Sequence, residues 1–174
     1  HFAVVKGFDL DRRKLILNSG LYENYEISMA TFERTWSRAD HWAVLALEPG
    51  DMPAVAEPLP YFTAIAAMEQ NNPANIVGRA YASGLQSWPN DANLLMGYGN
   101  LLYRDKQLSE AVVQFRKLID YQPEYAPAHN NLAHILFEQG QLALALVHAR
   151  HAVRLGGEFV ENYRASLGAI ESAQ

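Results

Sequence analysis

The spacing of hydrophobic residues changes near residue 50, and the two parts of the chain predict different structures. In the first part, short segments rich in β-branched and aromatic residues are separated by polar turns, which is the pattern of strands. We expect strands at residues 2–8, 14–17, 22–27 and 41–47. Before the last of them, Ser28 is placed to cap a short helix that carries Phe32 and Trp36 on one face. This part therefore predicts a small α+β segment with a short antiparallel sheet.

In the second part the hydrophobic positions recur with the helical period of 3.6. The pattern predicts seven helices, at residues 58–71, 74–87, 91–104, 107–121, 125–138, 141–155 and 158–172. Four of the eight prolines lie between Pro49 and Pro60, where they can neither continue a helix nor donate hydrogen bonds in a sheet. We therefore predict an α+β domain at residues 1–48, a proline-rich linker at 49–57 and a mainly α domain at 58–174.

The helical part contains an internal repeat of 34 residues. Five positions of one copy, Tyr98, Gly99, Leu102, Ala111 and Phe115, correspond to Leu132, Ala133, Leu136, Ala145 and Ala149 in the next. The same offset run backwards reaches Met68, Tyr81 and Pro89, which indicates a weaker third copy. This period and these small residues resemble the tetratricopeptide repeat, whose helix pairs stack into a solenoid. The resemblance implies three repeats and a capping helix.

The last predicted helix has the pattern of such a cap. Its apolar stripe consists of Phe159, Tyr163, Leu167 and Ile170, and its opposite, polar side carries Glu161, Arg164 and Ser166. A helix with one apolar face can cover the end of a stack while its other face meets water. We expect the stripe to face the repeats.

In tetratricopeptide arrays the first helix of each pair lines a concave face that binds extended peptides. Projecting the helical period onto that face selects Asn93, Met96, Asn100, Tyr103 and Arg104 from one copy and Asn130, His134, Phe137 and Glu138 from the next. Asn100 and Asn130 are the preferred contacts, because an amide can both donate to and accept from a peptide backbone. Tyr103 and Phe137 would supply apolar pockets. The alternative is that the two asparagines only hydrogen-bond to neighbouring helices.

The repeats also resemble, in fold, the tetratricopeptide domains that bind chaperone tails. Those domains grip a terminal carboxylate with lysines and an arginine at set positions of the groove. The matching positions here carry Phe62, Ala66, Gly97, Pro127 and Asn131. The carboxylate clamp is therefore absent, and a protein or an extended peptide segment bound in another way is the expected partner.

Composition excludes several other classes of function. The net charge is −5 and no dense run of Lys and Arg occurs beyond Arg12, Arg13 and Lys14, so we expect no nucleic-acid partner. The chain has no cysteine, which removes disulfides and thiolate metal sites. His148 and His151 lie three apart on one helix but have no third ligand nearby in sequence, so we expect a solvated helical face, no metal and no cofactor. No apolar run is long enough to span a bilayer, and membrane association stays open.

In the first part, His1 leads a strand with Phe2, a hairpin that carries Asn18 follows, and a Phe-x-x-x-Trp helix at Phe32 and Trp36 precedes a closing strand. This order resembles the C-terminal half of a C39-type peptidase domain, from a family of papain-like bacterial cysteine peptidases. In that family the hairpin brings an Asp or Asn beside the histidine. The resemblance implies that His1 is the general base and that Asn18 orients its imidazole. Where the family more often has Asp-Pro, this chain has Asn18 followed by Ser19.

The nucleophilic cysteine of such a peptidase is not in this chain, so we expect the chain alone to be inactive. Our leading hypothesis is a peptide-binding repeat module that recruits a substrate or partner for the intact enzyme. The alternative is a non-catalytic scaffold or adaptor in a bacterial secretion or envelope complex. The chain starts at His1 without a methionine, which suggests a fragment or a processed piece. The sequence does not decide between the cell envelope or periplasm and the cytoplasm as its location.

Overall fold

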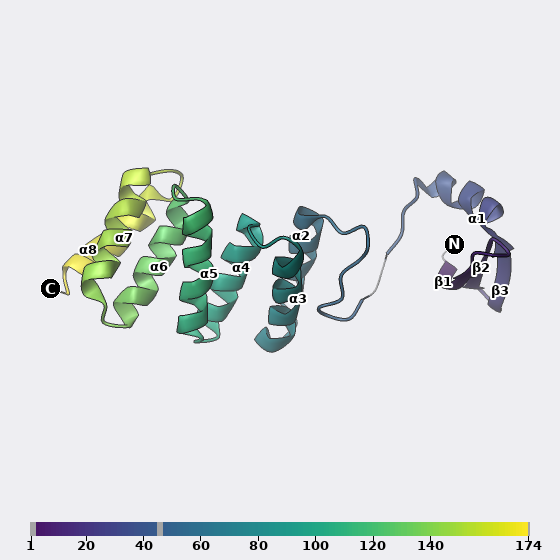
Figure 1. Cartoon of the computed structure of the whole chain (residues 1–174), viewed down its shortest axis with the longest axis horizontal. Coiled ribbons are helices and arrows are strands. Elements are labelled where there is room, and N and C mark those ends of the chain that lie inside the picture. The colour runs from purple at the N-terminus through teal and green to yellow at the C-terminus, as the bar shows by residue number, and fades with distance from the viewer. Residues whose placement is uncertain (1–2, 45–46, 174) are drawn as a thin grey trace. The chain divides into compact units, whose positions relative to one another are not determined.

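The structure is a computed structural model that describes residues 3–44 and 47–173. These residues form two compact units, His1–Ala46 and Leu47–Gln174, which are considered separately (Figure 1). The first unit contains a three-stranded antiparallel sheet followed by one α-helix and a turn of 3-10 helix. The second consists of seven α-helices in the residues described. The predicted fold class is confirmed: a mainly α solenoid preceded by a small α+β segment with a short antiparallel sheet.

The sheet of the first unit is a meander of neighbouring strands, with the order β1-β2-β3. Its elements are β1 (Ala3–Asp9), β2 (Lys14–Ser19), β3 (Tyr22–Ser28), α1 (Met29–Trp36) and η1 (Ser37–Ala39). Leu17 of β2 pairs with Val5 and with Tyr25, and it is the one buried hydrophobic side chain of the described part of this unit. Ser28 caps α1 as expected, because its side chain accepts a hydrogen bond from the Thr31 N–H. The first three predicted strands and the helix are thus present.

The fourth predicted strand, at residues 41–47, is wrong for the residues that the structure describes; residues 45–46 lie outside them. Asp40 and His41 have positive φ angles of 48° and 57°, which turn the chain out of an extended conformation. The backbone N–H of Trp42 donates to the carbonyl of Ala39, and the Trp42 carbonyl accepts from the indole N–H of Trp36 at 2.8 Å. The backbone of Trp42 therefore forms hydrogen bonds of a turn. The hydrophobic residues next to it in the sequence had indicated a strand.

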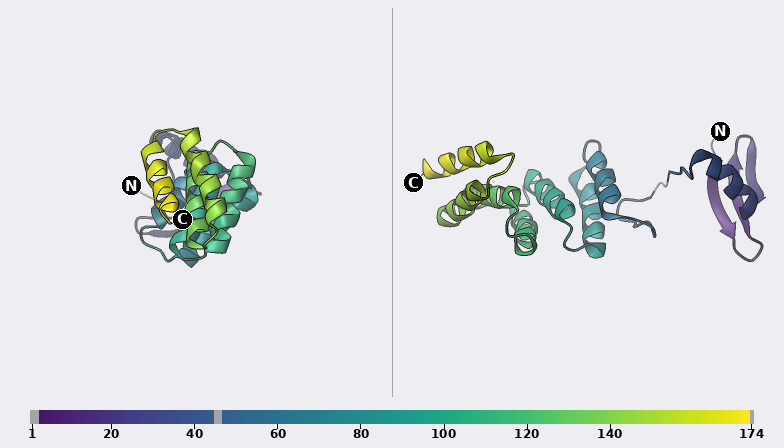
Figure 2. Two further views of the ribbon diagram at one scale, coloured as in Figure 1. Left: turned by 90° about the vertical axis from the view of Figure 1, so that its left-hand side faces the viewer. Right: turned by 90° about the horizontal axis from the view of Figure 1, so that it is seen from above.

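The second unit contains all seven predicted helices, with ends within three residues of the prediction. They are α2 (Pro58–Met68), α3 (Ala74–Ser87), α4 (Ala92–Arg104), α5 (Leu108–Tyr121), α6 (Ala126–Glu138), α7 (Leu142–Leu155) and α8 (Val160–Glu171). Each helix packs against the next one in the chain, and α4 and α6 also contact α2 and α8 respectively (Figures 1 and 2). This order of antiparallel neighbours is that of a helical-repeat stack. In the described residues no helix has the length and apolar character needed to cross a bilayer.

Local signals in the sequence explain where several helices begin and end. The Asp91 side chain caps α4 by accepting from the Leu94 N–H at 2.9 Å. Gly140 occupies the corner between α6 and α7 with a φ of 73°, a left-handed conformation that glycine adopts at little cost. Asn72, by contrast, does not cap the helix that follows it; its amide donates to the Met68 carbonyl at the end of α2. Pro73 is itself the N-cap residue of α3.

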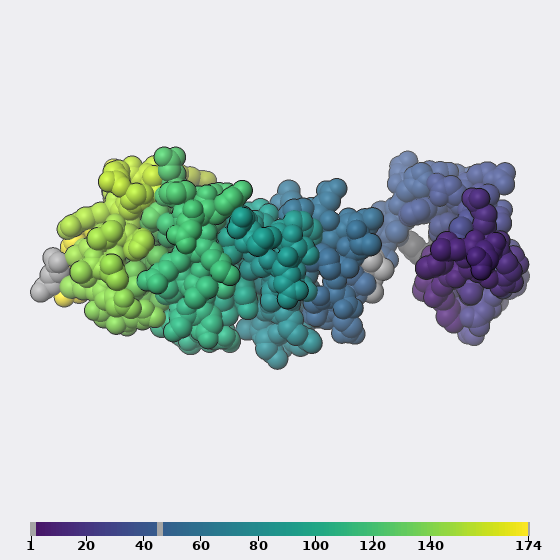
Figure 3. Space-filling view, in the orientation of Figure 1, coloured from purple at the N-terminus to yellow at the C-terminus, as the bar shows by residue number. Residues whose placement is uncertain are grey.

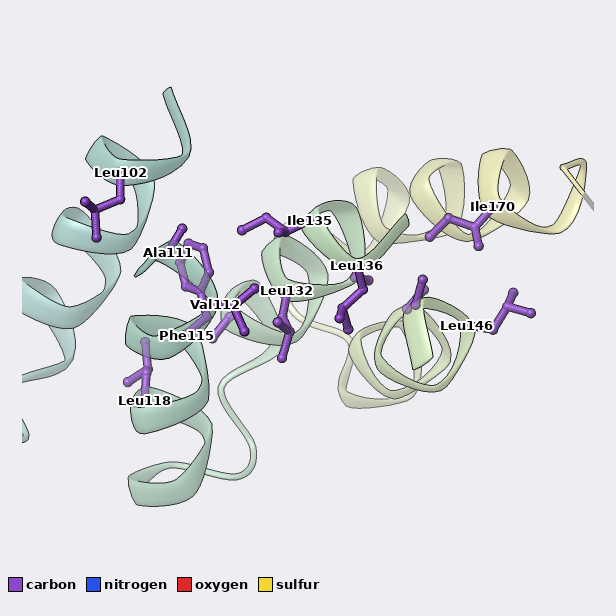
Figure 4. Close-up of a cluster of buried hydrophobic side chains, with 14 of the residues drawn as sticks. Leu102, Ala111, Val112, Phe115, Leu118, Leu132, Ile135, Leu136, Leu146 and Ile170 are labelled. Carbon is purple, nitrogen blue, oxygen red and sulfur yellow. The ribbon is translucent and has the colours of Figure 1, made fainter. Parts of the chain in front are cut away.

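Two large hydrophobic clusters and a small third one form the core of the second unit. Of the large clusters, one joins α2, α3 and α4 around Ile65, Tyr81 and Leu94, and the other joins α4 to α8 (Figure 4). The small cluster consists of buried residues from α6, α7 and α8: Ala126, Ala152 and Tyr163. The partly buried side chains of Leu85 and Tyr98 pack against both large clusters. Side chains of successive helices meet along the whole unit, as the space-filling view shows (Figure 3).

The small residues of the repeat lie where the helices approach most closely. Ala111, Ala133 and Ala145 are completely buried, and Gly99 is buried against the ring of Phe115. The capping stripe of α8 is only partly as expected. Tyr163 and Ile170 are buried and Leu167 packs against the core, but Phe159 is 50% exposed and precedes the helix. Ser166, expected on the polar side, is buried because its hydroxyl bonds to a side chain of α6.

Candidate functional site

A cavity of about 560 Å³ opens between α2, α3, α4 and α6, and we refer to it as the main cavity. It is lined by Phe62, Ala66, Glu69, Tyr81, Gly97, Asn100, Tyr103, Arg104, Asn131 and His134. The first helix of each repeat pair supplies most of these residues, and Tyr81 comes from the second helix of the first pair. The lining combines an aromatic wall with a small number of polar groups, which is the usual composition of a binding pocket.

The aromatic wall depends on a glycine. A Cβ atom at position 97 would lie 2.4 Å from the phenol oxygen of Tyr81, so only glycine lets that ring reach the cavity. The Tyr81 ring is fully buried and stacks on Tyr98, with ring centroids 5.7 Å apart. Together with Phe62 and Ala66, it gives one side of the cavity an apolar surface. This surface can hold an uncharged side chain of a ligand.

Glu69, at the end of α2, uses both carboxylate oxygens within the cavity. One oxygen accepts a 2.6 Å hydrogen bond from the Tyr81 hydroxyl, and the other forms an ion pair with Arg104 of α4. Burial and the hydrogen bond to Glu69 raise the pKa of Tyr81, so the phenol remains a neutral donor at physiological pH. The Glu69 side chain is 17% exposed, whereas that of Arg104 is 59% exposed. The mostly buried carboxylate of Glu69 therefore neutralises the charge of Arg104 on the side that faces the cavity.

Three asparagine side chains form a chain of amide hydrogen bonds from α6 to α4. The Asn130 amide donates to the Asn131 oxygen at 3.5 Å, and the Asn131 amide donates to the Asn100 oxygen at 2.8 Å. Because every bond runs in the same direction, the chain ends at the Asn100 amide nitrogen, for which no partner occurs among residues 3–44 and 47–173. Asn100 thus presents hydrogen-bond donors at the cavity wall.

His134 adds an acceptor to the same wall. The Ser166 hydroxyl donates its single proton to the Asn162 carbonyl at 2.9 Å, so it must accept the 2.9 Å bond from His134 Nε2. Neutral His134 therefore carries its proton on Nε2. Its Nδ1 has no hydrogen-bond partner among the described residues and can accept a hydrogen bond from a ligand. Ser166 sets this tautomer from α8, a role that the amphipathic pattern of that helix does not indicate.

The main cavity brings together four of the residues expected to bind a peptide: Asn100, Tyr103, Arg104 and His134. Asn130 does not line it, and its side-chain oxygen is buried without a hydrogen-bond partner in the described part of the chain. Met96 and Phe137 are partly buried against the core, and Asn93 is exposed outside the cavity. The Tyr103 hydroxyl donates to the Glu138 carboxylate, which raises the pKa of Tyr103.

Sequence reasoning missed Glu69 and Tyr81 and assigned no contact to Asn131. Four of the five positions matched to a carboxylate clamp, Phe62, Ala66, Gly97 and Asn131, do line the main cavity. At these four matched positions the cavity carries a phenyl ring, a methyl group, a glycine and one amide, and no cationic group. The signal that could have found Tyr81 is Gly97, since a glycine inside a helix often marks a close approach of another group.

Of the two proposed catalytic residues, His1 lies outside the described residues. Asn18 is in β2 opposite Val4, next to the point where the pairing register of β2 with β3 shifts. Its side-chain oxygen accepts a 3.0 Å hydrogen bond from the backbone N–H of Asn24. Asn18 therefore has a structural partner in the hairpin, and its role toward a histidine stays a prediction.

His148 is not part of a solvated helical face, contrary to expectation. Its Nδ1 is 3.0 Å from Nδ1 of the buried His129 of α6, whose ring also stacks on His151 at 4.3 Å. A carbonyl can only accept, so His129 Nε2 donates to the Pro123 carbonyl. Nδ1 of the neutral His129 ring therefore has no proton and accepts a hydrogen bond from Nδ1–H of His148. Among the described residues, no set of three or more His, Cys, Asp or Glu side chains is arranged to hold a metal ion.

Burial is the main reason why the two hydrogen-bonded histidines resist protonation. It lowers the pKa of His148 to about 4, with additional contributions from the charges of His129, Arg116 and His151. Burial also lowers the pKa of His129, although the hydrogen bond to the Pro123 carbonyl acts in the opposite direction. The pair is therefore neutral at physiological pH and links α6 to α7.

Comparison with known proteins identifies the helical unit. Residues 99–150 match the family model described as TPR repeat. Residues 99–150 of the helical unit therefore carry the tetratricopeptide repeat pattern. No curated protein matches the chain in sequence.

Solved structures with the same fold cover about two thirds of the chain. MamA protein has a TM-score of 0.60 and 17% identity over 67% of this chain and 63% of its own, so the match spans less than two thirds of MamA. The first tetratricopeptide domain of Spaghetti (RPAP3), bound to the HSP90 peptide SRMEEVD, has a TM-score of 0.61 and 16% identity, covering 67% and 91%. The type III secretion translocator chaperone SycD of Yersinia enterocolitica has a TM-score of 0.61 and 16% identity, covering 66% and 83%. At these identities the likeness establishes the fold.

Proposed function

We propose that the tetratricopeptide unit binds an extended segment of a partner protein in the main cavity. The observation that carries this proposal is the chain of amides that ends at Asn100, beside an aromatic wall and the acceptor of His134. An extended backbone presents carbonyl and N–H groups along its length, so it matches a wall with both a donor and an acceptor. An apolar side chain of the segment would contact Phe62 and Ala66, which are only partly buried.

The structural neighbours support this class of ligand. The Spaghetti domain is bound to an HSP90 peptide, and SycD is a translocator chaperone. Both have the helical-repeat architecture in which stacked pairs create a concave surface. The proposal that this chain also binds a peptide depends on its own main cavity and on the residues that line it.

The Asn100→Ala variant tests the proposal. A selection from a library of random peptides, with the whole chain immobilised, first supplies a peptide that binds. Asn100→Ala removes the unpaired amide and is expected to weaken binding of that peptide about three- to tenfold, the usual effect of one hydrogen bond. Asn93→Ala is the matched control, since this asparagine lies on the same helix but outside the cavity.

Isothermal titration calorimetry would measure both affinities. Thermal unfolding would check that both variants fold: Asn93→Ala should change stability by no more than about 0.5 kcal/mol, whereas Asn100→Ala also removes the acceptor of the Asn131 amide and should lose about 0.5–1.5 kcal/mol. Equal affinities of Asn100→Ala and Asn93→Ala would place the peptide elsewhere on the molecule. Failure of the library to yield any binder would count against peptide binding itself.

We further propose that the repeats recruit a substrate or partner for a C39-like cysteine peptidase, of which residues 1–48 would form the C-terminal part. Support comes from the order of the hairpin, the third strand and α1, and from the contact of the Phe32 and Trp36 rings at 5.6 Å. The absence of the expected closing strand at residues 41–44 favours the alternative, in which this unit is an adaptor and the protein is a scaffold.

The gene sequence separates the two possibilities. A cysteine in a Gln-x-x-x-x-Cys context upstream of His1 supports the peptidase, and a complete reading frame without one supports the scaffold. Because this chain has no cysteine, the purified chain is expected to leave peptides uncleaved. Peptide cleavage that persists after treatment with a thiol-alkylating reagent would contradict this assignment.

A further inference from the structure

Glu69 sets which peptides the main cavity accepts, and we propose that it favours uncharged internal segments over segments that end in a free carboxylate. The inference rests on the function proposed above and adds the class of ligand to it. Arg104 is the single Lys or Arg side chain among the described residues that line the cavity. Its ion pair with Glu69 leaves no uncompensated positive charge for a ligand carboxylate.

The position of Glu69 makes its effect larger than that of an exposed salt bridge. The carboxylate is mostly buried, whereas the arginine extends toward solvent. An anionic ligand group that approaches Arg104 from inside the cavity would therefore come close to Glu69, and like charges repel more strongly where water is partly excluded. A neutral amide or apolar group meets no such repulsion.

Charges at the edge of the cavity do not change this balance. Lys106 lies over the Tyr103 ring with its amine 5.5 Å from the ring centre. The Glu138 carboxylate accepts a hydrogen bond from the Tyr103 hydroxyl. The two cations, Arg104 and Lys106, are thus matched by two carboxylates, Glu69 and Glu138. The formal charges of these four residues cancel, in contrast to the cationic clamp expected for a terminal carboxylate.

The Glu69→Gln variant isolates the charge from the structural role of this residue. Glutamine keeps an oxygen that can accept the Tyr81 hydroxyl, but it carries no charge to offset Arg104. The cavity then gains one net positive charge without a change in side-chain size. Glu171→Gln is the matched control, because that carboxylate also pairs with an arginine, Arg150, but lies outside the lining.

Two peptide libraries displayed separately would test the inference on the full chain. One presents random peptides with free C-terminal carboxylates, and the other presents the same random segments followed by a neutral spacer. The unmodified protein is expected to enrich the spacer library and to select few Asp or Glu residues. Glu69→Gln is expected to increase enrichment of the free-carboxylate library about tenfold, and Glu171→Gln to leave it unchanged.

The outcomes separate this inference from the proposed function. Equal enrichment of both libraries by the unmodified protein, or no change in Glu69→Gln, would overturn the role of Glu69 while leaving peptide binding intact. Enrichment of neither library would instead contradict the proposed function. If Glu69→Gln does not fold, Arg104→Gln provides the opposite test, because the unpaired Glu69 is then expected to select peptides rich in Lys and Arg.

Discussion

A single methyl group added at Gly99 is expected to lower the free energy of unfolding of the helical unit by about 1–3 kcal/mol. A Cβ atom at this position would lie 2.6 Å from Cε1 and 2.8 Å from Cζ of Phe115. The Phe115 ring is 1% exposed and sits in the larger hydrophobic cluster, so it has no free space to move into (Figure 4). The loss should appear although alanine favours a helix by about 0.5–1 kcal/mol relative to glycine.

Gly168→Ala is the control for this prediction. Gly168 lies inside α8, and no atom comes within 4 Å of a Cβ built there, so the substitution should stabilise the unit by about 0.5–1 kcal/mol. Urea unfolding followed by far-UV circular dichroism measures both variants. A Gly99→Ala protein as stable as Gly168→Ala would show that α4 and α5 are not in the close contact described.

Acidification from neutral pH to about pH 4 is expected to cost the helical unit about 2–3 kcal/mol of stability. The pKa of His148 is about 4 in the folded protein because its ring is partly buried, and it returns to about 6.5 on unfolding. As the pH falls, His148 therefore takes up its proton at a higher pH in the unfolded chain than in the folded protein. The stabilisation is complete above about pH 6.5 and is lost as the pH falls toward 4; burial shifts His129 in the same direction.

The geometry of the pair explains why a second proton is unfavourable. His148 already donates through Nδ1, so a proton on Nδ1 of His129 would face another N–H at 3.0 Å. Arg116 from α5 and Arg154 from α7 add positive charge to this environment. The same arrangement predicts that acid separates α6 from α7, two helices of one repeat.

Unfolding measured across this pH range for His148→Gln is the decisive comparison. Glutamine can still donate to His129 but does not titrate, so the variant should lose less stability on acidification than the unmodified protein. His41→Gln changes an exposed histidine of the other unit and should leave the pH profile of the helical unit as it was. If the free energy of unfolding of His148→Gln depends on pH as steeply as that of the unmodified protein, groups other than His148 cause the loss of stability in acid.

Much of the helical unit could be predicted because its signals are local and repeated. The 3.6-residue period, Asp91 as a cap and Gly140 at a corner all act within a few residues of the helix end they specify. The residues 41–47 show the limit of such signals. A hydrophobic run indicates a strand only if another strand pairs with it, whereas Val44 is 76% exposed and Trp42 takes part in a turn.

The candidate site was predictable only in part for a geometric reason. Each residue turns a helix by about 100°, so a position is assigned to a face reliably but to a particular neighbour less well. Asn100, Tyr103, Arg104 and His134 fall on the lining, whereas the expected Asn130 is replaced by its neighbour Asn131. Glu69 and Tyr81 come from the weakest repeat copy, and their pairing across 12 residues has no counterpart in the other two.

The main cavity takes its walls from both large hydrophobic clusters. Phe62 and Tyr81 belong to the cluster of the first helix pair, and Asn131 and His134 project from a helix of the other cluster. Local opening of the first pair would therefore take the cavity apart. An occupant that touches both sides would hold the pair in place, so amide protons of α2 and α3 would exchange with solvent more slowly in the complex.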